Sequence, residues 1–98
     1  MQIIKTQNDA TLTLALEGRL DTTTAPQLEA ELKKSLNGIT SLTLDMTALE
    51  YLSSAGLRVI LSAQKVMNKQ GSMVVKNANE TIMEIFEVTG FSDILNLE

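Results

Sequence analysis

A leucine recurs at every second position in one short run near the N-terminus, and this period constrains the fold more than any other feature. The run is Thr11-Leu12-Thr13-Leu14-Ala15-Leu16-Glu17. Successive side chains of a β-strand point to opposite faces, so the pattern predicts a half-buried strand over residues 11–17. Ile3 and Ile4, followed by the turn-forming pair Asn8-Asp9, predict a first strand over residues 1–6 that forms a hairpin with it.

A helical pattern follows this hairpin, and a strand pattern follows the helix. Thr24, Pro26 and Gln27 predict a helix start with Thr24 as the cap. Leucines spaced by four residues continue the helix to the stop signal Asn37-Gly38. The next apolar residues, 39–44, predict a strand that closes on Asp45, with a loop over the residues between that aspartate and Ser53.

The second half of the chain repeats this alternation. A wide apolar pattern over residues 55–68 predicts a largely buried helix, which we expect to anchor the core through Leu57, Ile60 and Leu61. Residues 73–75 predict a short strand, and Asn79 predicts the cap of a third helix that Gly90 stops. A last short element is expected over residues 91–97.

The order of these elements is strand, strand, helix, strand, helix, strand, helix. Strands that alternate with helices indicate an α/β domain with a mainly parallel sheet and right-handed crossovers. We therefore expect one domain over residues 1–98, with about four to five strands built as a βα superhelix, an N-terminal hairpin, and helices on one face.

The amino-acid composition argues against several classes of function. The net charge is −4 and the basic residues are scattered, which argues against a nucleic-acid surface. The chain has no cysteine and no histidine, so it lacks thiol chemistry and both the commonest general base and the commonest transition-metal ligand. We expect no metal, no cofactor and no membrane insertion. The N-terminus does not resemble a signal peptide, so we expect a cytoplasmic protein or a soluble module attached to something else.

Four polar residues are expected to gather at the carboxyl ends of the strands, where α/β sheets bind ligands and partners. They are Asp21, Asp45, Ser53 and Ser54. The serines and aspartates could simply cap loops and a helix start. A serine nucleophile is a second interpretation, but no base adjoins the serines and no Gly-x-Ser-x-Gly elbow is present. A phospho-acceptor Asp45 is a third, but the acidic pair that would hold Mg²⁺ is missing.

The fourth interpretation is a serine that another enzyme phosphorylates. A phosphate at a helix N-terminus is well tolerated, because free backbone N–H groups and the helix dipole favour an anion there. The modification would add a charge of about −1.5 to −2 to the surface, next to Glu50. That is a usable switch for a docking face.

Three segments resemble one known family. They are Gly18-Arg19-Leu20-Asp21-Thr22-Thr23-Thr24-Ala25-Pro26, the stretch from Leu44 to Arg58 with Tyr51-Leu52-Ser53-Ser54-Ala55-Gly56-Leu57 inside it, and Val88-Thr89-Gly90-Phe91. The chain resembles the STAS domain, and most of all the small stand-alone bacterial anti-sigma factor antagonists. The resemblance spans essentially the whole chain.

The resemblance implies a partner-switching regulator and not an enzyme. The unphosphorylated protein would bind an anti-sigma factor with serine kinase activity, which would release a sigma factor. Phosphorylation of a loop serine would dissociate that complex, and a metal-dependent serine phosphatase would restore binding. An accessory subunit that supports a membrane lipid-transport ATPase is the alternative that the same resemblance leaves open, and an enzyme in its own right comes third.

Alignment with the family on Gly56-Leu57 places the phosphate acceptor at Ser54. Ser53 is a rival, because it stands where the best-studied members commonly have aspartate. We expect Ser54 to cap the helix at rest and Ser53 to support the loop. The resemblance also implies a shared partner-binding surface, on which Gly56 would leave the backbone bare for a kinase. The residues expected on that surface are Asp21, Thr22, Thr23, Leu52, Ser53, Gly56 and Arg58.

Overall fold

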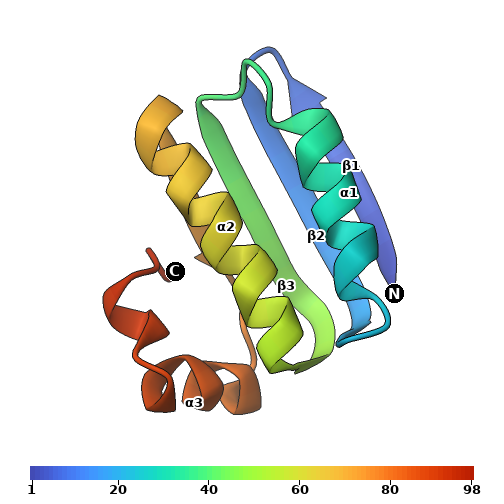
Figure 1. The fold of residues 1–98 in the computed structure, drawn as a ribbon, viewed down its shortest axis with the longest axis vertical. Helices are drawn as coiled ribbons and strands as arrows, with labels where there is room; N and C mark the ends of the chain where they lie inside the picture. Colours follow the sequence, from blue (N-terminus) through green and yellow to red (C-terminus); the bar gives the residue numbers. More distant parts are fainter.

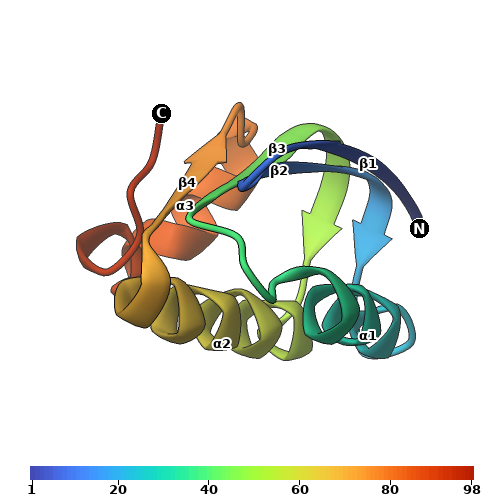
Figure 2. The ribbon, with the colours of Figure 1, turned by 90° about the horizontal axis from the view of Figure 1, so that it is seen from above.

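The strands follow one another across the sheet in chain order, as Figures 1 and 2 together show for the computed structural model, which describes residues 1–98. They are β1 (Gln2–Asn8), β2 (Thr11–Leu20), β3 (Ser41–Leu52) and β4 (Ser72–Lys76). Strand β1 pairs with β2 antiparallel, whereas β2–β3 and β3–β4 are parallel. The predicted α/β fold, with its N-terminal hairpin and mainly parallel sheet, is confirmed.

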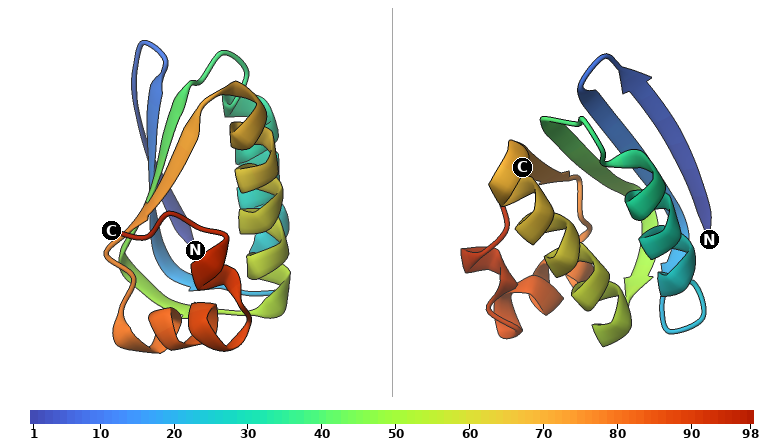
Figure 3. Two further views of the ribbon diagram at one scale, coloured as in Figure 1. Left: turned by 90° about the vertical axis from the view of Figure 1, so that its left-hand side faces the viewer. Right: turned by 45° about the horizontal axis from the view of Figure 1, so that its top comes forward.

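Two helices lie side by side on one face of this sheet, α1 (Ala25–Ser35) and α2 (Ser54–Gln70) (Figure 2). The third helix, α3 (Glu80–Val88), lies across the end of the sheet where the parallel strands finish (Figure 3). A 3-10 turn, η1 (Phe91–Asp93), follows it. The chain then returns to β4, where a single bridge joins Val75 to Leu97. A bilayer-spanning helix would have to be longer and more apolar than any helix of this chain.

The core lies between the sheet and the two helices. Leu12, Leu14 and Leu16 are fully buried and face it, as the alternating pattern predicts. Thr11 and Thr13 lie on the opposite, open face of the sheet, where Thr11 is exposed. Because that face is largely polar, it needs no covering layer. The buried apolar side chains form one core on the side that carries α1 and α2, and α3 adds Ile82 and Phe86 to it.

The caps of the helices differ in part from the prediction. Asn79 caps α3 as expected, because its Oδ1 accepts a hydrogen bond from the backbone N–H of Ile82 at 2.9 Å. Thr24 stands at the N-cap position of α1 as predicted, but its side chain makes no capping hydrogen bond, so that part of the prediction is wrong. Its hydroxyl lies 2.8 Å from the carbonyl oxygen of Arg19 and accepts a hydrogen bond from the N–H of Asp21 instead. The side chain of Thr24 therefore closes the turn before the helix.

Strand β3 is longer than the sequence pattern predicts, so the predicted loop between Asp45 and Ser53 is wrong. The strand continues to Leu52, but its buried residues change from every second position to Met46, Leu49 and Leu52. The pairing with β2 is irregular over the same region, with register shifts between Ala15 and Glu17 and again after Gly18. A bulged ladder breaks the period of two, and this hid the second half of the strand from the pattern.

Helix α2 anchors the core as expected through Leu57 and Ile60, which are both buried, but not through Leu61. Ile60 is fully buried, whereas Leu61 is only half-buried and does not belong to the buried core. The expectation that Leu61 anchors the core is therefore wrong. The apolar pattern of this helix is wide, so the sequence did not distinguish between two adjacent aliphatic residues.

Candidate functional site

The site is built where β3 ends and α2 begins. Ser53 has an extended backbone, and its Oγ accepts a hydrogen bond from the backbone N–H of Gly56 at 3.4 Å, which makes it the N-cap of α2. The backbone N–H of Ser53 donates to the carbonyl oxygen of Leu20 at 2.9 Å. The backbone N–H and the side-chain oxygen of Ser53 are thus both hydrogen-bonded within the fold, and the residue is half-buried.

Ser54 is the first residue of α2, and it is exposed. Its hydroxyl takes part in no hydrogen bond within the protein, unlike that of its neighbour Ser53. The expectation that Ser54 caps the helix is therefore wrong, because the residue before the first helical turn is the one whose side chain reaches the orphan backbone N–H groups. Ser54 is left with a free hydroxyl on the surface.

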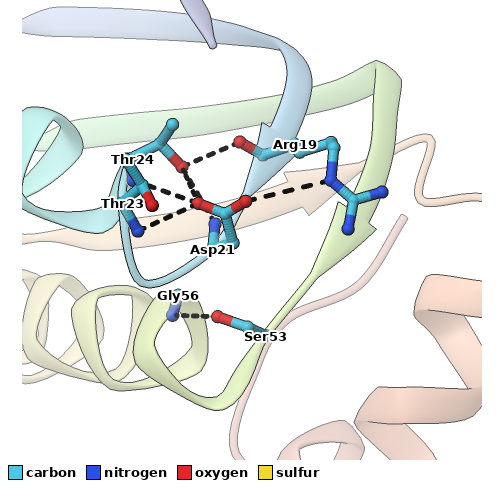
Figure 4. A network of polar contacts seen from close by, with 6 residues as sticks. All are labelled: Arg19, Asp21, Thr23, Thr24, Ser53 and Gly56. Atoms are coloured by element: carbon cyan, nitrogen blue, oxygen red, sulfur yellow. Dashed lines mark hydrogen bonds and ion pairs between the residues drawn. The ribbon is translucent and has the colours of Figure 1, made fainter.

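The loop after β2 lies beside this turn, as Figure 4 shows, and Asp21 orders it. One carboxylate oxygen of Asp21 accepts hydrogen bonds from the backbone N–H groups of Thr23 at 3.0 Å and Thr24 at 3.1 Å. The other oxygen lies 3.8 Å from Nε of Arg19. Asp21 is therefore bound to its own loop, as the capping interpretation predicts.

These contacts favour the charged form of Asp21. The backbone N–H of Thr24 makes the largest contribution, and the pKa of the Asp21 carboxyl is held below its ordinary value of 3.8. The N–H of Thr23, the hydroxyl of Thr24 and the charge of Arg19 act in the same direction. The loop next to Ser54 is thus ordered by a carboxylate that stays ionised at neutral pH.

Side chains from the loop before α1 and from α2 meet beside Ala55, the residue after Ser54. Thr22 from the loop before α1 and Ala55 and Arg58 from α2 line one open hollow of about 370 Å³. Thr23 is also exposed. Arg58 is exposed and belongs to no ion pair of the protein, although five such pairs form elsewhere. The structure therefore brings Thr22 and Arg58 onto one surface, which reaches Ser54 through its neighbour Ala55.

Two residues expected on this surface are buried. Leu52 is 2% exposed and belongs to the core. A Cβ added to Gly56 would stand 2.7 Å from Cγ of Leu20 and 2.7 Å from Cδ1 of Leu52, so this glycine exists to let the helix approach the ends of two strands. The prediction that Leu52 and Gly56 contact a partner is wrong, because apolar residues next to a helix cap close the core there.

Asp45 also lies elsewhere. It sits within β3 opposite Ala15 and Lys76, and its carboxylate accepts hydrogen bonds from the hydroxyl of Thr47 at 2.6 Å and the backbone N–H of Thr47 at 3.0 Å. The hydroxyl of Thr47 is the main cause that lowers the pKa of Asp45. The expected convergence of Asp45 with Asp21 and the serines is wrong, because β3 continues for seven residues beyond Asp45.

The structure adds two residues that sequence reasoning missed. The guanidinium carbon of Arg19 lies 4.3 Å from the centre of the Tyr51 ring, and both side chains are exposed. The two residues are register partners at the ends of β2 and β3. The sequence did contain a signal for this pair, since Arg19 and Tyr51 stand close to the predicted site residues Asp21 and Leu52. Pairing them required knowing that β3 continues past Asp45 and runs beside the end of β2.

The chemistry available at this surface is that of a hydroxyl, on Ser54, which can accept a group from another enzyme. No group of three or more Asp and Glu side chains gathers to hold a metal ion. Arg19 and Arg58 are the basic side chains nearest in sequence to Asp21 and Ser54, and neither bonds to the hydroxyl of Ser54. A serine hydroxyl without a base is a weak nucleophile by itself. It can receive a group from an enzyme that brings its own base.

Comparison with known proteins gives the family. Residues 2–98 match the model of the STAS domain. The chain is 36% identical to BtrV of Bordetella bronchiseptica over 96 residues, covering 96% of this chain and 83% of that protein. It is 30% identical to the anti-sigma-B factor antagonist of Listeria monocytogenes over 98 residues, covering 97% of this chain and 85% of that protein.

Among solved structures, the fold is similar to that of the Bacillus cell fate determinant SpoIIAA in its phosphorylated form. The TM-score is 0.78 at 17% identity, and the match covers 99% of this chain and 91% of that chain. At 17% sequence identity, this similarity shows that the two chains share a fold. Because the family model covers all but the first residue, and relatives at 30% identity or more cover nearly the whole chain, this chain belongs to the STAS domain family.

Proposed function

We propose that this chain is an anti-sigma factor antagonist that switches partners through phosphorylation of Ser54. In its unphosphorylated form it binds an anti-sigma factor with serine kinase activity. The kinase transfers the γ-phosphoryl group of ATP to Oγ of Ser54, ADP leaves, and the hydroxyl proton passes to a base of the kinase. A metal-dependent serine phosphatase returns the hydroxyl by hydrolysis. The names of the relatives and the geometry around Ser54 support this role.

One observation carries the proposal: the hydroxyl of Ser54 is exposed and unbonded, while the adjacent Ser53 makes the helix cap. A phosphate on Ser54 therefore breaks no hydrogen bond of the fold. It would also lie at the N-terminus of α2, where the helix dipole favours an anion. The modification can change the surface without unfolding the domain.

The effect on a partner follows from desolvation and charge. A phosphoserine carries a charge of about −1.5 to −2 at neutral pH. A kinase surface that covers a neutral hydroxyl would have to bury this charge, which costs several kcal/mol when nothing pairs with it. Since about 1.4 kcal/mol corresponds to a tenfold change in affinity, the loss is at least about 100-fold.

The docking surface contains the exposed residues around Ser54. Arg58 lies one helical turn after it on the same side of α2, and it has no partner within the protein. Thr22 and Thr23 come from the neighbouring loop, and Asp21 holds that loop in place. We add Tyr51 to this surface, because exposed aromatic side chains are frequent anchors of protein interfaces.

The test is binding of purified kinase to matched variants of Ser54. A pull-down with the Ser54→Ala chain, which cannot be released by phosphorylation, recovers the kinase. Calorimetric titration should then give similar affinities for the parent and for Ser54→Ala. Ser54→Asp should bind at least about 100-fold more weakly. Ser72→Asp, on an exposed residue at the start of β4 and thus at the opposite end of the parallel strands from Ser54, is the charge control and should bind like the parent.

The outcomes separate the possibilities. If Ser54→Asp binds as tightly as the parent, Ser54 is not the switch. If the pull-down recovers a membrane-transport ATPase and no kinase, the chain is an accessory subunit and the proposed role is wrong. Circular dichroism of each variant shows whether a loss of binding reflects a loss of fold.

A further inference from the structure

The negative charge of the protein is concentrated at its C-terminal end. Residues 77–98 contain five acidic and no basic residues, a net charge of −5. Residues 1–76 hold eight basic against seven acidic residues, a net charge of +1. The whole surplus of negative charge therefore lies on α3, on η1 and on the segments around them. An uneven distribution of this kind is typical of a surface that attracts a cationic partner.

Most of these carboxylates have no partner. Glu98 lies 3.9 Å from Nζ of Lys76, but the other four form no ion pair. All four are exposed, and they are Glu80, Glu84, Glu87 and Asp93.

Three of the four follow each other along one side of α3. Glu80, Glu84 and Glu87 are spaced by four and then three residues, which brings like charges together on the helix surface. Glu87 also stands in the last turn, where the helix dipole disfavours a negative charge. The arrangement works against the stability of the helix, and a cationic partner would relieve it.

The same segment of the chain carries the most exposed aliphatic side chains of the protein. Val88 is 79% exposed and Ile94 is 50% exposed. Val88 is four residues after Glu84 on α3, and Ile94 follows η1, which lies beside the end of that helix in Figures 1 and 3. Two exposed aliphatic side chains in the same segment as four unpaired carboxylates resemble the composition of a small interface with a charged rim.

We propose that this α3–η1 face binds a protein segment that presents lysine or arginine side chains beside one or two aliphatic side chains. The residues of the face are Glu80, Glu84, Glu87, Val88, Asp93 and Ile94. None of them bonds to Asp21, Ser53 or Ser54. The proposal is therefore independent of the phosphorylation of Ser54, and it adds a second docking surface to the domain.

The probe is a pair of synthetic peptides of identical composition. One places its lysines and leucines on one face of a helix, and the other scrambles their order. Titration of the isotope-labelled protein by NMR should give chemical-shift changes confined to residues 80–95, with affinity that falls as salt rises. The amphipathic peptide should bind at least about tenfold more tightly than the scrambled one.

Two double variants separate the contribution of apolar contact to peptide binding from the contribution of charge. The double variant Val88→Ser/Ile94→Ser should bind both peptides equally, because only the apolar contact distinguishes them. The double variant Glu84→Gln/Glu87→Gln should weaken both peptides and reduce the dependence on salt. Val66→Ser, which changes another exposed aliphatic residue, is the control and should bind like the parent. The changed residues are exposed, so each variant is expected to fold, and its denaturation midpoint verifies this.

Three results would overturn the proposal. Equal affinity of the parent for the two peptides would mean that charge alone attracts them. Chemical-shift changes outside residues 80–95 would place the binding surface elsewhere. Dimerisation of the parent in sedimentation experiments, lost in Val88→Ser/Ile94→Ser, would assign the face to a second copy of this chain.

Discussion

The Oγ of Ser53 accepts a hydrogen bond from the backbone N–H of Gly56 at 3.4 Å, and this bond gives the two adjacent serines different roles. Ser53 holds the start of α2. Ser54, one position later, has no bond to lose and stands on the surface. A structural serine next to a free one allows a modification of the second without cost to the fold.

Alanine at each serine should therefore have a different effect on stability. Ser53→Ala removes the cap and should lower the free energy of unfolding by about 0.5–1 kcal/mol, at the low end of the usual range because the bond is long. Ser54→Ala should change it by less than about 0.5 kcal/mol, as is usual for exposed positions. Urea denaturation at neutral pH measures both. A larger loss at Ser54 than at Ser53 would reverse the assignment of the cap.

Gly56→Ala should destabilise the domain although it lies in a helix. Alanine is favoured over glycine in helices by about 1 kcal/mol, but the new Cβ would stand 2.7 Å from carbons of Leu20 and Leu52. Overpacking of this kind usually costs about 1–3 kcal/mol, so we expect a net loss of about 1 kcal/mol. Denaturation of the variant measures it. A gain in stability would show that the two leucines move aside freely.

Alanine substitutions at the adjacent residues Ile60 and Leu61 test which side of α2 faces the core. Ile60 is fully buried, so Ile60→Ala should lower the free energy of unfolding by about 2–5 kcal/mol. Leu61 is half-buried, so Leu61→Ala should cost about 1 kcal/mol or less. Chemical denaturation of the two variants, side by side, gives the difference. Equal costs would mean that α2 is rotated relative to the sheet.

Stability should fall in acid because of Asp21. The pKa of this carboxyl is lower in the folded chain than its ordinary value of 3.8, mainly through the N–H of Thr24. The ionised form stabilises the fold at any pH above the unfolded value, and this contribution is lost as pH falls through the lower, folded value. Denaturation between about pH 5 and pH 2 measures the slope.

Asp21→Asn should make that slope shallower. Asp45→Asn should act in the same direction, since the hydroxyl of Thr47 lowers the pKa of Asp45 too. Stability that falls just as steeply in the variant that lacks both carboxylates would mean that other groups control the acid sensitivity.

The sequence was sufficient for the fold wherever the period of the apolar residues stayed regular. The leucines of β2 alternate and the leucines of α1 recur every four residues, and both elements form as predicted. The period fails in β3, where bulges against β2 change the spacing of buried residues to three. Irregular pairing depends on the neighbouring strand, so a single segment does not reveal it.

The candidate site was predictable only in part for a similar reason. Thr22 and Arg58 line one hollow, and Ala55, the residue after Ser54, lines it with them. Gly56 was assigned to that surface because a glycine exposes its backbone, yet its lack of a side chain serves the packing of Leu20 and Leu52. Whether a glycine faces water or the core depends on tertiary packing. The stack of Arg19 on Tyr51 depends on the same contacts between strands.

The most direct test of the central claim is the position of the phosphate. The kinase recovered by pull-down, with ATP, is incubated with the parent chain, with Ser53→Ala and with Ser54→Ala, and the peptides that contain residues 53 and 54 are fragmented in a mass spectrometer. We predict one phosphate on Ser54 in the parent and in Ser53→Ala, and none in Ser54→Ala. A phosphate on Ser53 in the parent, or undiminished phosphorylation of Ser54→Ala, would contradict the account.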